Sequence, residues 1–183
     1  MKLTKPEIVK AAGIIISKAG INALKVDALA LEMGITRNEL LPLFKKDDEI
    51  LMLILLNLEN EIQLLINDGK KMDYSPEKEL QYLFRKLYEL FNQETYYLHV
   101  IFSTEMIEKD NNIQKILTRI KEIAKAYLFQ LLEQGKQTGV FSNKIATSHL
   151  VKRTLGSFRL LMNDQHLTNK MIRDFRILRA EIE

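Results

Sequence analysis

The side chains that most often carry out catalysis or bind metals are sparse in this sequence. It contains no cysteine, which excludes disulfides, thiolate zinc sites, iron–sulfur clusters and cysteine nucleophiles. His99, His149 and His166 lie in no metal-binding spacing, and no glycine-rich phosphate loop or nucleophile elbow is present. Glu105 and Glu108 have the spacing of neighbours on a solvated helix face. The sequence therefore predicts no enzyme, no cofactor and no metal site.

The remaining chemistry is contact with a polyanion, and the charged residues that favour it lie near the N-terminus. Residues 1–47 carry eight Lys or Arg against five Asp or Glu, whereas residues 48–183 carry nineteen of each. Arg37 and Asn38 are adjacent; arginine can pair with guanine or contact phosphate, and asparagine can pair with adenine. A modestly basic head on a neutral body suits nucleic acid, although surface lysines alone often produce such a count.

These side chains must be positioned by helices, because apolar residues recur at spacings of three and four and no sustained alternation is present. The chain has 183 residues, of which seven are Gly and three are Pro, so it can form a substantial core with few loops. We expect an all-α protein of about nine helices. Near the N-terminus the expected helices are 5–19, 27–33 and a short third helix that Thr36 caps and Pro42 ends.

The rest of the chain predicts longer helices separated by glycine, proline and polar turns. They are expected at about 47–67, 76–92, 95–109, 111–137, 143–163 and 168–182. The longest apolar run, Ile50–Leu56, is much shorter than the roughly 20 residues that span a bilayer. The N-terminus has no cleavable signal pattern, so we expect a soluble, cytoplasmic protein.

Two short helices around Gly34 have the lengths and the turn of a helix-turn-helix, the motif that offers its second helix to the DNA major groove. We expect Gly34 to be needed because the two helices pack too closely for a larger side chain. The motif lies within a longer pattern made of Ile8, Ala11, Ala12, Gly20, Val26, Leu29, Ala30, Ile35, Thr36, Leu40, Phe44 and Leu51. Together these residues resemble the N-terminal domain of the tetracycline-repressor (TetR) family of bacterial regulators. A later stretch around Gly139–Phe141 and Leu150–Phe158 resembles the family's last-but-one helix.

The resemblance implies a helix-turn-helix DNA-binding domain at 1–47 and a helical ligand-binding and dimerisation domain at 48–183. It implies a homodimeric transcriptional regulator, expected to be a repressor, that binds a double-stranded operator and responds to a small, largely apolar effector. No membrane partner is implied. Carried over position by position, the residues expected to contact DNA are Lys25, Thr36, Arg37, Asn38, Lys45 and Lys46.

Several positions depart from the family pattern. Leu41 replaces a phosphate-binding tyrosine, and Pro42 shortens the reading helix. Glu39 brings a carboxylate towards the phosphates unless it reads a cytosine amino group, which is less common. Lys25 stands where a capping threonine usually begins the second helix, and Asp47 replaces a common lysine. An alternative hypothesis therefore stays open, in which the chain is a TetR-like helical dimer that has lost specific DNA readout and serves as a ligand-binding or protein-interaction module.

Aromatic residues are concentrated in the expected C-terminal domain, where ten of the fourteen Phe and Tyr lie between Tyr74 and Phe129. Aromatic rings on facing helices can form an apolar ligand pocket, although such stripes more often form core. The residues expected to contact the ligand are Tyr88, Phe91, Tyr97, His99, Phe102, Met106, Tyr127 and Phe158.

The last two expected helices carry apolar stripes that one small body cannot bury on every side, which favours pairing with the same helices of a second chain. In the family such a four-helix interface forms the dimer. The residues expected in it are Leu150, Thr154, Leu155, Phe158, Phe175 and Leu178.

Overall fold

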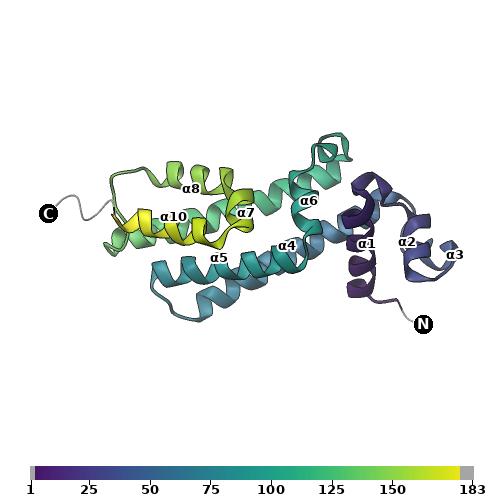
Figure 1. The fold of residues 1–183 in the computed structure, drawn as a ribbon, viewed down its shortest axis with the longest axis horizontal. Helices are drawn as coiled ribbons and strands as arrows, with labels where there is room; N and C mark the ends of the chain where they lie inside the picture. Colours follow the sequence, from purple (N-terminus) through teal and green to yellow (C-terminus); the bar gives the residue numbers. More distant parts are fainter. Residues whose placement is uncertain (1–2, 178–183) are drawn as a thin grey trace. The chain divides into compact units, whose positions relative to one another are not determined.

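A computed structural model describes residues 3–177, and the chain in that range consists of ten α-helices and two 3₁₀ helices, η1 and η2, with no β-strand (Figure 1). The expectation of an all-α fold is confirmed. The helices form two compact units. The first unit contains the chain up to Glu61 together with Glu94–Ile120, and the second contains Ile62–Gln93 and the chain from Lys121 onward.

The first unit begins with a small helical head. It comprises α1 (Lys5–Ala19), η1 (Ile21–Ala23), α2 (Val26–Met33), α3 (Arg37–Leu40) and the start of α4 (Asp47–Lys71). As expected, Thr4 and Glu7 form a capping box before α1, and the chain leaves that helix at Gly20. Ala12, Leu29 and Leu40 are fully buried and form a core in which α1 packs on α2. This core orients the start of α3.

The turn between α2 and α3 depends on Gly34, for a reason that differs from the expected one. Gly34 adopts φ 66° and ψ 31°, the left-handed region, and its N–H donates to the carbonyls of Ala30 and Leu31. A Cβ atom built at this position meets nothing within 4 Å. The expected explanation, close packing of the two helices, is therefore wrong. The turn needs glycine because residues with a side chain adopt this left-handed backbone conformation only at an energetic cost.

Gly34→Ala is expected to lower the free energy of unfolding by about 1–2 kcal/mol, the cost of placing an L residue with a Cβ in the left-handed region. Gly34→Asn should cost less, because asparagine tolerates that region. Urea denaturation followed by circular dichroism measures both values. Equal losses for the two variants would show that space, and not backbone conformation, limits this position.

The remainder of the first unit contains α6 (Tyr96–Phe102), η2 (Thr104–Glu108) and the first part of α7 (Asn111–Gln137). A single helix over 95–109 was expected, and that prediction is wrong. Ser103 is extended, and its side chain accepts a hydrogen bond from the N–H of Glu105, so the serine starts a new turn. Tyr97 on α6 is buried, and its hydroxyl oxygen accepts a hydrogen bond from Asn57 Nδ2 on α4 at 2.7 Å.

The second unit contains the end of α4, α5 (Pro76–Gln93), the rest of α7, α8 (Thr147–Gly156), α9 (Phe158–Asn163) and α10 (Gln165–Ile177). The prediction of one helix over 143–163 is wrong, because the segment begins at Thr147 and breaks at Ser157. The last helix starts earlier than expected, since Asp164 Oδ1 accepts the N–H of His166 at 2.8 Å. Its expected end at 182 lies outside the described residues. The helix α10 packs against α5 and α9.

No helix among residues 3–177 is both long enough and apolar enough to span a membrane.

Candidate functional site

The segment α2–Gly34–α3 forms a compact helix-turn-helix whose second helix is a single turn. The capping box of Thr36 and Glu39 starts α3, and the chain leaves it at Leu41, next to Pro42. The side chains of Arg37 and Asn38, at the start of α3, are exposed. The start of the second helix is the part of this motif that contacts bases, so both residues occupy a position suited to readout.

Glu39 uses its carboxylate within α3. One oxygen accepts hydrogen bonds from the backbone N–H and from the hydroxyl of Thr36, both at 2.8 Å. The hydrogen bond from the Thr36 backbone, followed by that from its side chain, lowers the pKa of Glu39, so the carboxylate is ionised at neutral pH. The negative charge of Glu39 thus lies at the N-terminus of α3, where it is attracted to the positive end of the helix dipole.

Lys25 and Asp47 depart from the family pattern together, and the structure brings them into contact. Asp47 Oδ1 accepts the N–H of Val26, the first residue of α2, at 2.8 Å. Its other oxygen lies 3.4 Å from Lys25 Nζ. Asp47 thus accepts, from α4, one of the N–H groups left free at the start of α2, and it partly neutralises Lys25.

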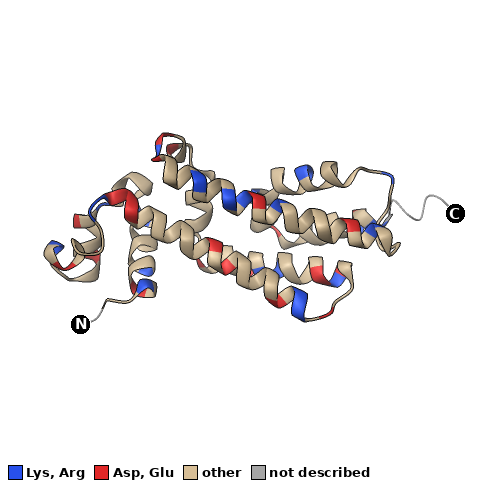
Figure 2. Cartoon of the chain, turned by 180° about the vertical axis from the view of Figure 1, so that it is seen from behind, with Lys and Arg blue, Asp and Glu red and all other residues tan. Residues whose placement is uncertain are grey.

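Arg37 is also paired with an acidic residue of the head. Its Nη1 donates to both carboxylate oxygens of Asp27, at 3.0 and 2.9 Å. Figure 2 shows both blue (Lys, Arg) and red (Asp, Glu) segments along the ribbon of the head, and two of its basic residues, Lys25 and Arg37, are paired with carboxylates. The side chains of Arg37 and Asp27 are both more than half exposed, so their ion pair is weak, and a DNA phosphate could replace Asp27 as the partner of Arg37.

Lys45 and Lys46, in the turn before α4, keep their ammonium groups in solvent. Their backbone N–H groups donate to Glu49, but neither side chain makes an ion pair with a residue in the part of the chain that the structure describes. Of the six residues expected to contact DNA, Asn38, Lys45 and Lys46 have side chains that make no hydrogen bond or ion pair with another residue within 3–177. Two exposed leucines, Leu41 and Leu43, flank Pro42 in the same segment.

The residues expected to contact a ligand are divided between the two units. Tyr97, His99, Phe102 and Met106 lie in the first unit, and Tyr88, Phe91, Tyr127 and Phe158 lie in the second. The structure brings Phe91 and Phe158 together edge to face, with ring centroids 5.4 Å apart. His99 and Phe102 are exposed, whereas Tyr97 and Met106 are buried. Among residues 3–177, no three His, Asp or Glu side chains are grouped to hold a metal ion.

Three of the six residues expected at the dimer interface contribute to the core of the second unit. Leu150, Thr154 and Phe175 are buried within one chain, and Leu155 and Phe158 are half-buried. Leu178 lies outside the described residues. Among the residues of α9 and α10 whose burial is described, the exposed large apolar side chains are those of Leu160 and Leu167. They lie beside a shallow groove of about 250 Å³ that Leu161 and Met171 also line.

No family sequence model matches the chain, and a comparison with characterised proteins finds no match. Its fold does match solved structures along almost the whole chain. The ketosteroid transcriptional regulator KstR2 of Mycobacterium tuberculosis superposes with a TM-score of 0.78 at 15% identity, covering 96% of both chains. FadR of Bacillus subtilis, solved with stearoyl-CoA, gives 0.73 at 17%, covering 96% of this chain and 99% of that one.

The TetR-family regulator PfmR of Thermus thermophilus gives a TM-score of 0.72 at 20% identity, covering 96% of this chain and 88% of that one. The chain has the TetR-family fold. The resemblance carried by residues 5–51 is therefore matched by a structural likeness that extends through the C-terminal helices.

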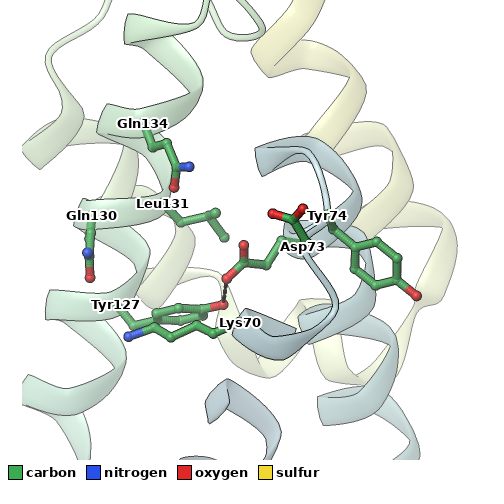
Figure 3. A pocket seen from close by; sticks show the side chains of 8 residues that line it. Lys70, Asp73, Tyr74, Tyr127, Gln130, Leu131 and Gln134 are labelled. Carbon is green, nitrogen blue, oxygen red and sulfur yellow. Dashed lines mark hydrogen bonds between the residues drawn. The ribbon is translucent and has the colours of Figure 1, made fainter. Parts of the chain in front are cut away.

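One feature of this TetR-like fold was not predicted from the sequence. A polar cavity in the second unit is lined by Glu79 on α5 and by Gln130 and Gln134 on α7, and of the eight expected ligand residues it includes only Tyr127 (Figure 3). The signal was present: Glu79 precedes the buried residues Leu83 and Leu87 in steps of four. A carboxylate therefore stands on the buried face of α5.

Proposed function

We propose that the chain is a homodimeric transcriptional regulator, acting as a repressor, that binds a double-stranded operator and is controlled by a small, largely apolar effector. The observation that carries this proposal is the exposure of Arg37 and Asn38 at the start of α3 and of Lys45 and Lys46 in the turn before α4, with neither lysine in an ion pair among residues 3–177. We assign DNA reading to residues 1–47, and effector binding and dimerisation to residues 48–183.

The effector class is supported by the proteins that share the fold. Stearoyl-CoA is bound in the B. subtilis FadR structure, and KstR2 is named as a ketosteroid regulator. Both names point to ligands with a large apolar part. The aromatic residues of the second unit, including the edge-to-face pair Phe91 and Phe158, favour a ligand of the same character.

Regulation follows from a shift between two spacings of the DNA-binding heads. Adjacent half-sites in successive major grooves require heads about 34–36 Å apart, so DNA favours that spacing. An effector that binds more tightly to a conformation of the dimer with a different head spacing shifts the population towards that conformation and so releases the dimer from DNA. Because binding free energies are coupled reciprocally, operator DNA should weaken effector binding by the same factor.

A second function is favoured by two observations on the head. Arg37 and Lys25, two of the expected DNA contacts, are each paired with a carboxylate, and the reading helix is a single turn long. A TetR-like dimer that has lost specific readout and binds a ligand or a protein would have these features. The two functions differ in how binding to DNA responds to salt.

The proposed regulator should bind a fragment of its own upstream DNA saturably, and more weakly as salt rises, since lysines and arginines release counterions from phosphates. Arg37→Ala should weaken binding about five- to hundredfold, because a bidentate base contact contributes about 1–3 kcal/mol. Lys25→Ala should reduce the salt slope by about 1, because one phosphate is then no longer neutralised. Fluorescence anisotropy titrations at several salt concentrations measure both effects.

Asp27→Asn should have the opposite effect to Arg37→Ala. It removes the carboxylate that pairs with Arg37, so the arginine is free to contact DNA and DNA binding should become stronger. Lys152→Ala, which removes an exposed charge from α8, serves as the control and should change neither affinity nor slope. If Arg37→Ala and Lys25→Ala also bind like the unmodified protein, DNA does not contact this surface, and the second function is favoured.

A further inference from the structure

The polar cavity of the second unit has the features of a binding site distinct from the expected apolar one. It has a volume of about 240 Å³ and is lined by the end of α4, the turn after it, the start of α5 and the second half of α7 (Figure 3). It is too small for a drug-sized apolar ligand and sufficient for a small polar one.

Glu79 is the central group of this cavity. Glu79 is only 9% exposed, and one of its carboxylate oxygens accepts a hydrogen bond from the hydroxyl of Tyr127 (dashed line in Figure 3). Every fully buried side-chain nitrogen or oxygen among the described residues has a hydrogen-bond partner. The second oxygen of Glu79 makes no hydrogen bond with a described residue. It is therefore not fully buried, and we infer that it faces the cavity that Glu79 lines.

The hydrogen bond from Tyr127 has a fixed direction. Burial, reinforced by the hydrogen bond to Glu79 and by its negative charge, raises the pKa of the Tyr127 hydroxyl above its ordinary value. The phenol therefore keeps its proton and remains the donor, and Glu79 remains the acceptor. This arrangement occupies one oxygen of Glu79 and leaves the other as an acceptor facing the cavity.

The charge around Glu79 is unbalanced. Lys70 holds its ammonium group over the face of the Tyr127 ring, 5.3 Å from the centroid, and makes no ion pair with a described residue. Asp73 adds a second carboxylate to the lining, and the other lining side chains are neutral. The lining thus carries two carboxylates against one ammonium group, and a cation entering the cavity would be attracted by this excess of negative charge.

We propose that this cavity binds a small molecule that carries a protonated amine, with the ammonium group donating to the free oxygen of Glu79. The two amide groups, Gln130 and Gln134, lie one turn apart on α7 and can accept from or donate to the rest of the molecule. The two carboxylates disfavour an anion, and the polar lining disfavours an apolar ligand. The inference goes beyond the proposed function and requires neither DNA nor a dimer.

The test uses three four-carbon probes that differ in charge: 1,4-diaminobutane, butane-1,4-diol and succinate. Isothermal titration calorimetry of the full chain without DNA should show saturable binding of the diamine and no saturable binding of the diol or of succinate. Glu79→Gln should weaken diamine binding at least tenfold, because it removes the charge and keeps an oxygen for the Tyr127 hydroxyl. Asp73→Asn should weaken it less, and asparagine suits the φ of 48° at that position.

Glu89→Gln is the matched control, since it removes the same charge from α5 at a residue that pairs with Lys86 instead of facing the cavity. It should leave diamine binding unchanged. The proposal is overturned if the unmodified protein does not bind the diamine saturably, if the diol binds as tightly, or if Glu79→Gln has no effect. The discrimination between diamine and diol decides the question even if Glu79→Gln does not fold.

Discussion

Leu160→Glu is expected to raise the dissociation constant of the proposed dimer at least a hundredfold and to weaken operator binding with it. Leu160 is 62% exposed on α9, beside the groove that Leu167 also lines. Burying one leucine side chain stabilises by about 1.5–3 kcal/mol, and a two-fold interface buries each residue twice. The loss is therefore about 3–6 kcal/mol, or roughly a hundred- to ten-thousandfold in Kd. Analytical ultracentrifugation over a range of concentrations measures it.

Leu64→Glu provides the control for this substitution. Leu64 is an exposed leucine on α4, 48% accessible, in the same unit but outside the groove. The control variant should remain dimeric, because the new charge stays in water. If Leu160→Glu dimerises with an unchanged Kd, the second chain binds another surface, and the half-buried residues Leu155 and Phe158 become the next candidates.

The helix boundaries that could be predicted from the sequence are those set by local signals. Thr4 with Glu7 starts α1 and Gly20 ends it, within the residues expected. The missed breaks, at Ser103 and at Ser157, interrupt stretches whose apolar periodicity continues across the break. Periodicity reports which face of a helix is buried, and it does not detect a serine that ends one helix and begins the next.

The electrostatic pairs of the head could not be predicted, because they join residues that are far apart in the sequence. Asp47 accepts the N–H of Val26 across 21 positions and pairs with Lys25, so two departures from the family pattern compensate each other. The pairing of Arg37 with Asp27 likewise depends on how α3 turns back on α2. The positions of charged residues are visible in a sequence, whereas their partners depend on tertiary packing.

Phe141→Ala is expected to lower the free energy of unfolding by about 3–5 kcal/mol, which is typical for removing a buried phenylalanine ring. Phe141 follows α7, is 2% exposed, and packs edge to face against Phe175 of α10 with ring centroids 6.0 Å apart. Its ring also lies directly against the backbone of Gly135. Denaturation by urea, followed by circular dichroism, measures the loss.

Gly135→Ala should also destabilise, although alanine usually favours helices over glycine. A Cβ at position 135 would lie 2.1 Å from Cδ2 of Phe141, so the ring must move, at a cost of about 1–3 kcal/mol. In the double variant Gly135→Ala with Phe141→Ala the ring is absent, and the alanine at 135 should then be neutral or stabilising. The two losses should therefore not add, with a coupling energy of at least about 1 kcal/mol. Additive losses would mean that the contact between Phe141 and Gly135 does not hold the end of α7 against α10.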